Sequence, residues 1–366
     1  MLKGNKGEWS EIYVFFKLLG DGRIYAADDR LKQIEKLYFP IVKIIREEET
    51  GTQYEYVIAD SGRIKLMHDG NCIANFAAME FADQARELFK SIAKVSKNSA
   101  FSVENIEKFM FDIKCQKIKA PPPSTENGRH SKIDITMQIH DPNTNLELVR
   151  GFSIKSELGE PPTLLNASNA TNFIYEVQGL SDDEIATINA IGTKSKIKDR
   201  MHAIRTKSNV FSFYKVADET FEANLEIVDS RLAELLSYAI VHYYIDGVTR
   251  CTDIVELLIK DNPLDILNPH SYYSTKFKKF LASVALGMIP ATPWDGCDEA
   301  SGGYIIVTRS GKVLSYHIRN RDNFEEYLLQ STRFEKASSG RHKFASLYKT
   351  CDKTLIKLNM QIRFMR

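Results

Sequence analysis

The alternation of apolar and polar residues predicts a helix followed by strands in the first part of this chain. Residues 7–19 carry apolar side chains at helical spacing and end at the breaker cluster Gly20-Asp21-Gly22, so we expect an N-terminal helix. Runs rich in β-branched and aromatic residues then predict several strands, and two stretches of helical periodicity follow them. The strands are expected at 23–27, 39–46, 54–59 and 63–67, and the helices at 79–95 and 103–111.

A β-hairpin is predicted after a loop that contains three consecutive prolines. The loop covers 121–131, and its prolines cannot continue a helix or a strand. Residues 132–139 alternate strictly between apolar and polar side chains, which is typical of a half-buried strand. A turn at 141–145 leads to a second strand at 146–156, so the two strands are expected to pair.

The rest of the chain is predicted to be helical first and strand-rich afterwards. Helices are expected at 181–191, 200–204, 224–244, 253–260 and 271–284, and strands at 304–309, 313–318 and 357–364. This order predicts an α/β fold, in which a mixed central sheet around the hairpin has helices on both faces, with a helical insertion and a C-terminal β-containing region. We divide the chain into regions 1–180, 181–300 and 301–366, with a boundary expected near 290–303.

The composition is that of a globular protein. The 366 residues are 43% hydrophobic and 27% charged, which excludes disordered and fibrous classes and allows one large domain or two ordinary ones. The five cysteines are odd in number and include no CxxC pair, so they indicate neither a disulfide framework nor a structural zinc site. The N-terminus lacks the layout of a signal peptide, and the apolar runs are well short of the ~20 residues that span a bilayer. We therefore expect a soluble cytoplasmic protein without contact to a membrane.

Basic residues cluster locally, although the net charge of +1 does not by itself indicate a nucleic-acid-binding protein. The clusters lie at 194–207, 276–279 and 319–349. An isolated basic run is most often a solvated helix face, so each cluster is compatible with either a solvated surface or a local surface for nucleic acid.

The predicted hairpin brings three chemically notable side chains together. Ser153 and Lys155 share one face of the second strand because strand side chains alternate, and Asp134 lies at the start of the first strand. This pattern resembles the PD-(D/E)XK nuclease arrangement, in which an aspartate on one strand and an acid-x-lysine on the next build a magnesium site. Phosphodiester hydrolysis needs a hard cation with oxygen ligands, which explains the residue types. Here Ser153 replaces the second acid, so the pattern is degenerate and an ordinary hairpin would carry it equally well.

Three glutamates are candidates for the missing carboxylate. The sequence from Lys6 to Glu11 resembles the KGxxxE start of a helix in several nucleases of this superfamily, where the glutamate points into the metal site. That match favours Glu11 over Glu8. Alternatively, Glu8 is a first-turn acid favoured by the helix dipole and Glu11 a solvated neighbour. Glu157, on the same strand face as Lys155, is the third candidate.

Long blocks of the chain are similar to the HpaII restriction endonuclease family. The blocks are 6–29, 38–48, 151–173, 302–318, 341–349 and 358–364, so the similarity covers most of the chain. The resemblance implies a PD-(D/E)XK core and a type II site-specific deoxyribonuclease that cuts double-stranded DNA within CCGG, with Mg²⁺ as its cofactor. It also implies a bacterial restriction–modification system, in which a separately encoded DNA methyltransferase protects the host site. A homodimer is compatible with such an enzyme, but the sequence leaves the oligomeric state open.

The same resemblance assigns roles within the catalytic set Asp134, Ser153, Lys155 and Glu11. Asp134 would bind the metal directly, together with the backbone carbonyl of Ile154. Glu11 would complete the metal ligands or orient a water, and Lys155 would assist the nucleophile. The expected reaction is in-line attack of water on the scissile phosphate, which leaves 5′-phosphate and 3′-hydroxyl ends.

Two polar segments are candidates for DNA contact. The first follows the catalytic strand and supplies Asn166, Ser168, Asn169 and Asn172, and the second supplies Ser339, Arg341 and His342, with Arg333 nearby. Arg and Asn side chains read base edges, while Ser and basic side chains hold phosphates. A helix cap and turn cluster would explain the first segment equally well. Trp9 and Trp294 are interpreted as packing residues.

Other chemistries find no support in the sequence. It contains no P-loop, GxGxxG, HExxH or GxSxG motif, and its eight histidines have no metal-like spacing. Two alternatives to a restriction enzyme stay open. The first, suggested by Ser153, is a sequence-specific DNA-binding protein that has lost cleavage. The second is a repair nuclease that selects DNA structure or mismatches.

Overall fold

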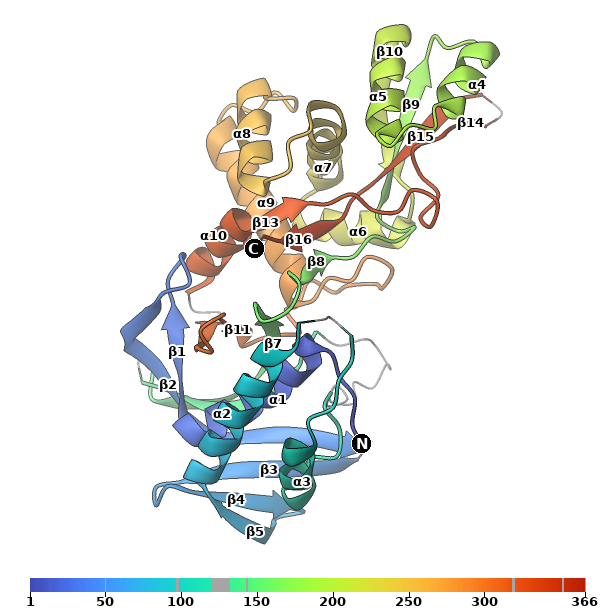
Figure 1. The fold of residues 1–366 in the computed structure, drawn as a ribbon. Helices are drawn as coiled ribbons and strands as arrows, with labels where there is room; N and C mark the ends of the chain where they lie inside the picture. Colours follow the sequence, from blue (N-terminus) through green and yellow to red (C-terminus); the bar gives the residue numbers. More distant parts are fainter. Residues whose placement is uncertain are drawn as a thin grey trace. The chain divides into compact units, whose positions relative to one another are not determined.

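The chain forms two compact units (Figure 1). The computed structural model describes residues 1–49, 51–96, 99–119, 132–142, 144–317, 320–350 and 352–365, so the predicted loop at 121–131 lies outside the described residues. Unit 1 consists of Met1–Pro162 and Asp298–Tyr327, and unit 2 of Thr163–Cys297 and Leu328–Met365. The chain therefore leaves unit 1 after the predicted hairpin and returns to it for one further segment.

Unit 1 contains a nine-stranded mixed sheet, which confirms the expected α/β fold with a mixed central sheet (Figure 1). The strand order is β1-β12-β11-β7-β6-β2-β3-β4-β5, and β1 also pairs with β2. Most neighbours are antiparallel, but β7 runs parallel to β11 and β1 runs parallel to β12. The strands are β1 (Arg23–Ala27), β2 (Gln33–Glu49), β3 (Thr52–Ala59), β4 (Arg63–His68), β5 (Asn71–Ala77), β6 (Ile135–Asp141), β7 (Leu146–Ser156), β11 (Gly303–Val307) and β12 (Val313–His317).

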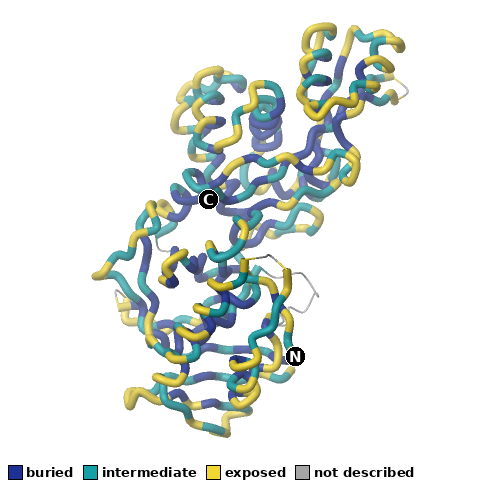
Figure 2. The backbone as a smooth tube through the Cα atoms, viewed as in Figure 1, coloured by how far each residue is buried: buried dark blue, intermediate teal, exposed yellow. Residues whose placement is uncertain are grey.

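Helix α1 (Lys6–Asp21) forms the centre of the unit 1 core. It begins with a capping box, in which the Glu8 N–H donates to Asn5 Oδ1 (3.0 Å) and the Asn5 N–H donates to Glu8 Oε2 (2.8 Å). Its large apolar side chains, among them Trp9 and Phe16, are fully buried. Figure 2 colours the backbone by burial, and buried segments occur in both units. Phe16 makes edge-to-face ring contacts with Phe81 of α2 (Ala78–Lys94) and with a phenylalanine of α3 (Glu104–Asp112).

A second helix covers the other face of the sheet in unit 1. Phe324 of α10 (Arg321–Ser331) packs against Tyr304 and Tyr316, with ring centroids 5.0 and 5.9 Å away. Tyr304 points away from its neighbour Ile305, which belongs to the core beneath α1, because successive strand side chains alternate. Helices therefore lie on both faces of this sheet, as the sequence predicts.

Unit 2 combines helices with two small sheets. The sheets have the orders β10-β9-β15-β14 and β13-β16-β8. The strands are β8 (Thr163–Leu165), β9 (Asn172–Gln178), β10 (Val210–Val216), β13 (Thr332–Phe334), β14 (Leu347–Lys349), β15 (Thr354–Asn359) and β16 (Ile362–Phe364). The helices are α4 (Asp182–Ala190), α5 (Lys196–Lys207), α6 (Glu219–Val228), α7 (Leu232–Val241), α8 (Cys251–Asp261) and α9 (Pro269–Leu286), with a π-helical turn at His242–Asp246. No helix of the described residues is both long and apolar enough to cross a membrane.

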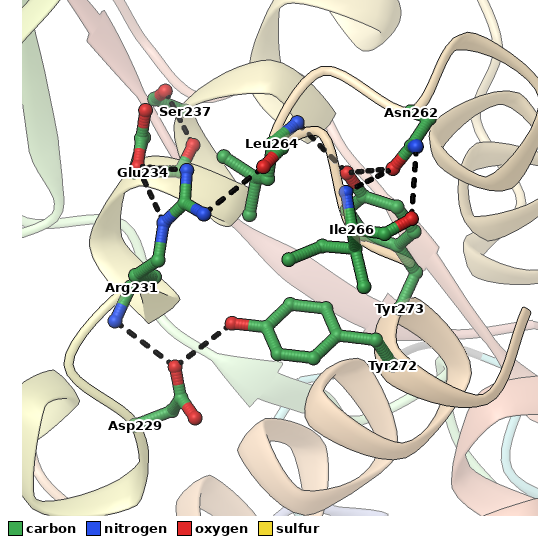
Figure 3. Close-up of polar contacts among 9 residues, drawn as sticks. All are labelled: Asp229, Arg231, Glu234, Ser237, Asn262, Leu264, Ile266, Tyr272 and Tyr273. Atoms are coloured by element: carbon green, nitrogen blue, oxygen red, sulfur yellow. Dashed lines mark hydrogen bonds and ion pairs between the residues drawn. The ribbon is translucent and has the colours of Figure 1, made fainter. Parts of the chain in front are cut away.

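The single helix predicted at 224–244 is wrong, because the chain breaks between α6 and α7 at Asp229 (Figure 3). The backbone of Asp229 is extended, at φ −165° and ψ 136°. Its Oδ1 accepts hydrogen bonds from the Arg231 N–H (2.9 Å) and the Tyr272 hydroxyl (3.0 Å), and Lys276 pairs with its Oδ2 at 2.5 Å. These contacts give the Asp229 carboxylate hydrogen-bond and ion-pair partners that an uninterrupted helix would not provide.

Several other elements were not expected from the sequence. They are the strands β5, β8, β9, β10, β13 and β14 and the helix α10. The single strand predicted at 357–364 is two strands, β15 and β16, which join different sheets of unit 2. Strand β5 has no buried residue, and its apolar residues do not alternate strictly with polar ones, so its sequence lacks the period of a half-buried strand.

Candidate active site

Strands β6 and β7 pair as the sequence predicts, with Ile135 opposite Phe152. Asp134 lies one residue before β6, and its N–H donates to the Phe152 carbonyl oxygen at 2.9 Å. This bond extends the ladder past the end of the strand. Asp134 is therefore held beside the residues of β7 that follow Phe152.

A chain of hydrogen bonds connects the three predicted hairpin residues. The Ser153 hydroxyl donates to Asp134 Oδ2 at 3.0 Å, and Lys155 Nζ donates to Ser153 Oγ at 3.0 Å. The Ile154 N–H also donates to Asp134 Oδ2, at 2.7 Å. Ser153 is only 1% exposed, so its hydroxyl is shielded from water and forms its hydrogen bonds with Asp134 and Lys155 instead. The structure thus brings Asp134, Ser153 and Lys155 together, and Ser153 bridges the other two.

Tyr304 is a member of this cluster that the sequence reasoning missed. It lies on β11, which pairs in parallel with β7, and its register partner is Ser153. Lys155 Nζ lies 5.3 Å from the centre of its ring, a cation–π distance. Residues 302–318 are one of the family-like sequence blocks, but nothing in the sequence indicates that Tyr304 lies near Lys155. Only the pairing of β11 with β7 brings the two side chains together.

Glu11 approaches the same cluster from α1. Its Oε2 atom is buried and has no hydrogen-bond partner among the described residues. Burial, together with the nearby Asp134 carboxylate, raises the pKa of Glu11 to about 8. Glu11 lines two pockets, one of about 220 Å³ with Asp134 and one of about 340 Å³ with Lys155. The structure therefore places Glu11 beside the hairpin residues.

The two other candidate glutamates have partners elsewhere. Glu8 takes part in the capping box of α1 through its Oε2 atom. Glu157 Oε2 accepts a hydrogen bond from the Arg309 N–H at 3.2 Å. Of the three candidates, Glu11 is the one that lines both pockets of the cluster.

The donor set fits a hard divalent cation. Glu11 and Asp134 offer carboxylate oxygens, which such cations prefer, and the unpartnered oxygen of Glu11 lacks the compensation that a cation would supply. In the described part of the chain no three His, Cys, Asp or Glu side chains form a group that could hold a metal. Backbone and water oxygens would have to complete the ligand shell.

Comparison with known proteins identifies the family. A family model described as HpaII restriction endonuclease matches residues 5–364. This chain belongs to the HpaII restriction endonuclease family. It is 37% identical over 364 residues to the type II restriction enzyme HpaII of Haemophilus parainfluenzae, with 99% of this chain and 98% of that protein covered. No solved structure matches the chain. The resemblance inferred from the sequence blocks is thereby confirmed, and the protein is a site-specific deoxyribonuclease of the type II restriction class.

The candidate site of this HpaII-family enzyme also contains a buried arginine that the sequence did not indicate. Arg46 lines the 220 Å³ pocket with Glu11 and Asp134. Its guanidinium pairs with Glu48 at 2.8 Å, donates to the Lys117 carbonyl oxygen at 2.9 Å and lies over the Phe15 ring at 5.1 Å. Its positive charge opposes the rise in the pKa of Glu11. No sequence motif distinguishes this arginine from other strand residues.

Lys132 is a second cation near the hairpin residues. Burial, and then the like charge of Lys155, lower the pKa of Lys132 to about 8, against the opposing effects of Glu299 and Asp134. Its N–H donates to Glu299 Oε2 at 3.0 Å. Lys132 lies at the start of the predicted alternating segment, where its position gave no indication of burial.

The residues predicted to contact DNA lie in unit 2, in two neighbouring segments. The Asn172 side chain donates to the His342 carbonyl oxygen (3.0 Å) and accepts from the Asn359 side chain (2.8 Å), so its amide is engaged inside the unit. Ser168 is partly buried, with its carbonyl oxygen bonded to Asn359. Other predicted residues are exposed or half-exposed at the surface: Asn166, Asn169, Arg333, Ser339, Arg341 and His342.

Proposed function

We propose that this HpaII-family enzyme cleaves double-stranded DNA at a short specific site, CCGG, in a Mg²⁺-dependent reaction on a PD-(D/E)XK core. The observation that carries the proposal is the Asp134–Ser153–Lys155 hydrogen-bond chain beside the buried, unpartnered oxygen of Glu11. The name of the 37% identical relative and the sequence blocks shared with its family support CCGG as the target.

Each residue of the cluster has a defined task in this proposal. Asp134 and Glu11, with the Ile154 carbonyl, would hold Mg²⁺. When bound, Mg²⁺ neutralises charge on the phosphate and lowers the pKa of an attacking water. Lys155 carries the positive charge that stabilises the developing negative charge on the scissile phosphate.

Ser153 and Tyr304 position Lys155 for this task. The serine hydroxyl accepts a hydrogen bond from the ammonium group, and the tyrosine ring lies beside it on β11. The lysine is therefore held in one location, and no carboxylate of the described residues forms an ion pair with it. Such pre-positioning avoids a reorganisation cost at the moment of reaction.

Two copies of the chain would serve the two strands of a palindromic site. CCGG reads the same on both strands, and the described residues contain one Asp134–Ser153–Lys155 cluster per chain. A homodimer with two-fold symmetry would match the symmetry of the DNA. A separately encoded methyltransferase that protects CCGG is the proposed functional partner.

The decisive experiment is digestion of unmethylated and CpG-methylated plasmid with Mg²⁺. We expect discrete fragments ending at CCGG from unmethylated DNA and intact methylated DNA. The Asp134→Ala and Lys155→Ala variants should lose cleavage by at least about 10²-fold, because each removes a charged group that acts on the phosphate. Random or structure-dependent nicking by the wild type would contradict the proposal.

A matched set of glutamate variants identifies the second carboxylate. Glu11→Gln should abolish cleavage, whereas Glu8→Gln and Glu157→Gln should keep it, because their carboxylates have partners elsewhere. Cleavage that survives in Glu11→Gln and is lost in Glu157→Gln would transfer the role to Glu157.

Ser153, in the place of an acid, also favours a second candidate, a DNA-binding protein without cleavage. Specific binding of CCGG duplexes with intact DNA under every divalent cation would select it.

A further inference from the structure

A cationic pocket of unit 1 takes no part in the site described so far. Its volume is about 530 Å³, and it is lined by the β1–β2 connection, the start of β2, the residue after β7 and the β11–β12 connection. Its charged lining residues are the cations Arg30, Lys32, Arg309 and Lys312 and the acids Glu35 and Glu157. The lining therefore has an excess of positive charge, although the net charge of the whole chain is only +1.

The four cationic side chains are accessible to a ligand. All four residues are exposed. Within the part of the chain that the structure describes, none of them forms an ion pair with a carboxylate. The hydroxyl groups of Thr308 and Ser310 lie in the same lining, 3.0 Å from each other. The pocket thus offers positive charges and hydroxyl donors, the groups that hold phosphates.

Tight turns fix the two connections that carry the cations. Asp28 Oδ1 accepts hydrogen bonds from the N–H groups of Arg30 (3.0 Å) and Lys32 (2.8 Å). In the other connection, the Thr308 N–H donates to the Lys312 carbonyl oxygen (2.9 Å) and the Lys312 N–H donates to Thr308 Oγ1 (3.0 Å). The backbone beneath the charges is ordered before a ligand arrives, which lowers the entropic cost of binding.

Glu157 links this pocket to the catalytic strand. It follows Lys155 by two positions, so the two residues are about 7 Å apart along the strand direction. Its N–H donates to the Val307 carbonyl oxygen (2.9 Å), and its Oε2 accepts from the Arg309 N–H (3.2 Å). A DNA strand whose scissile phosphate lies at Lys155 therefore passes close to the pocket.

We infer that this pocket binds the phosphate backbone of the DNA substrate beside the scissile phosphate. The inference rests on the proposed function, because it places the scissile phosphate at Lys155. The pocket supplies affinity that is independent of base sequence and sensitive to salt, since its contacts are ionic. Its exposed arginines and lysines release counterions from the DNA, and its hydroxyls fix the register of the strand.

The test compares Arg309→Gln/Lys312→Gln and Arg30→Gln/Lys32→Gln with the wild type in DNA binding. Two duplexes, with and without CCGG, are titrated without Mg²⁺ over a series of salt concentrations. Each double variant should weaken both duplexes by the same factor and reduce the slope of log K against log salt by about two, one for each lost phosphate contact. Lys36→Gln/Lys65→Gln is the matched control, because both lysines are exposed residues of the same sheet outside the pocket, and it should keep the wild-type slope.

A duplex with single neutral methylphosphonates near the cut supplies a second readout. Wild-type affinity should fall at one or two modified positions, and the Arg309→Gln/Lys312→Gln variant should be insensitive at the same positions. Unchanged slopes in both pocket variants would overturn the inference while leaving the proposed function intact. Conversely, if the wild type never cuts CCGG but the pocket variants still lower the salt slope, the proposed function fails and phosphate binding at the pocket stands without a scissile phosphate beside it. A wild type without measurable DNA affinity would overturn both.

Discussion

At the scale of single residues, Ser153 is the most informative departure from the acid-x-lysine pattern. Its hydroxyl donates to Asp134 and accepts from Lys155, so it holds the two charged groups in a fixed relation without adding a negative charge. A carboxylate at this position would pair with the lysine and also repel Asp134. The second carboxyl group comes instead from Glu11 of α1, whose pKa is raised by burial and by the nearby Asp134 carboxylate.

We expect Ser153→Ala to lower the cleavage rate by about 10- to 100-fold, the usual effect of losing a group that orients a catalytic one. The fold should be kept, because alanine fits within the volume of the buried serine. Single-turnover cleavage measures the effect on catalysis, and binding of a CCGG duplex measures the effect on DNA affinity. The cleavage rate should fall while the affinity changes little. Ser153→Thr keeps the hydroxyl and is the control. An alanine variant as active as the wild type would show that the hydroxyl bridge is dispensable.

The protonation of Glu11 should make stability depend on pH in the absence of divalent cations. Its pKa is raised from 4.5 to about 8, so the folded protein holds a proton that the unfolded chain releases. The contribution of Glu11 to stability is therefore complete below about pH 4.5 and is lost as the pH rises through about 8. Because glutamine has no charge to bury, Glu11→Gln should raise the unfolding temperature by about 2 °C or more at pH 8 and leave it nearly unchanged at pH 4.5.

Thermal unfolding in EDTA at both pH values measures this difference. Glu8→Gln is the comparison, because Glu8 lies in the same helix but serves its capping box. Equal shifts of Glu11→Gln at both pH values would contradict a buried, protonated Glu11.

At the scale of elements, two contacts fix the helix and strands around the β6–β7 hairpin. The hydroxyls of Ser10 on α1 and Ser156 on β7 lie 2.8 Å apart in a buried hydrogen bond. The second contact joins Arg46 and Glu48 of β2 to residues 116–117. Glu48 Oε2 accepts hydrogen bonds from the Gln116 and Lys117 N–H groups at 2.9 and 3.1 Å. Both contacts join segments that are distant in the sequence.

Breaking the Arg46–Glu48 pair on one side should destabilise unit 1 strongly. Arg46 is 5% exposed and Glu48 1% exposed, so Glu48→Gln leaves a buried guanidinium without its counter-charge. We expect a loss of about 3–5 kcal/mol in the free energy of unfolding. The double variant Arg46→Met/Glu48→Met should lose less, because it buries no unpaired charge. Chemical denaturation of the three proteins measures the difference, and an equal loss in single and double variants would contradict a buried ion pair.

At the scale of the whole molecule, the nine-stranded sheet of unit 1 depends on two distant parts of the chain. Strand β11, all of whose residues are buried, lies between β7 and β12, and it belongs to a segment that follows most of unit 2 in the sequence. The Asp134–Ser153–Lys155 cluster lies in unit 1, while the DNA-contact residues predicted from the sequence lie in unit 2. The cluster therefore has all of its neighbours only when the segment that carries β11 has joined the first segment of unit 1.

A chain that ends at residue 297 should therefore fail to form a stable unit 1. It lacks β11 and β12, so β7 loses its parallel partner and Lys155 loses the Tyr304 ring. We expect no cleavage and no cooperative thermal unfolding of this fragment, in contrast to the full chain. Circular dichroism and plasmid digestion test this, and a fragment that unfolds cooperatively would show that the first segment folds alone.

The sequence by itself determined the local elements and the chemistry of the hairpin. Strict alternation in 132–139 predicted β6 and its pairing with β7, and the alternation of side chains placed Ser153 and Lys155 on one face, because both follow from the two-residue period of a strand. The long family-like blocks gave the family. Helical periodicity likewise predicted α1, because it is a local property, and the resemblance of Lys6 to Glu11 to the KGxxxE helix start gave the candidate Glu11.

The tertiary structure decided which residues surround that hairpin. Tyr304, Arg46 and the cations of the pocket beyond β7 come from segments far away in the sequence, and only sheet order and register bring them together. The break at Asp229 was hidden for the same reason, because its carboxylate is satisfied by Tyr272 and Lys276 of another helix. Long-range pairing leaves no periodic trace in a single sequence, so these contacts could be known only from the folded chain.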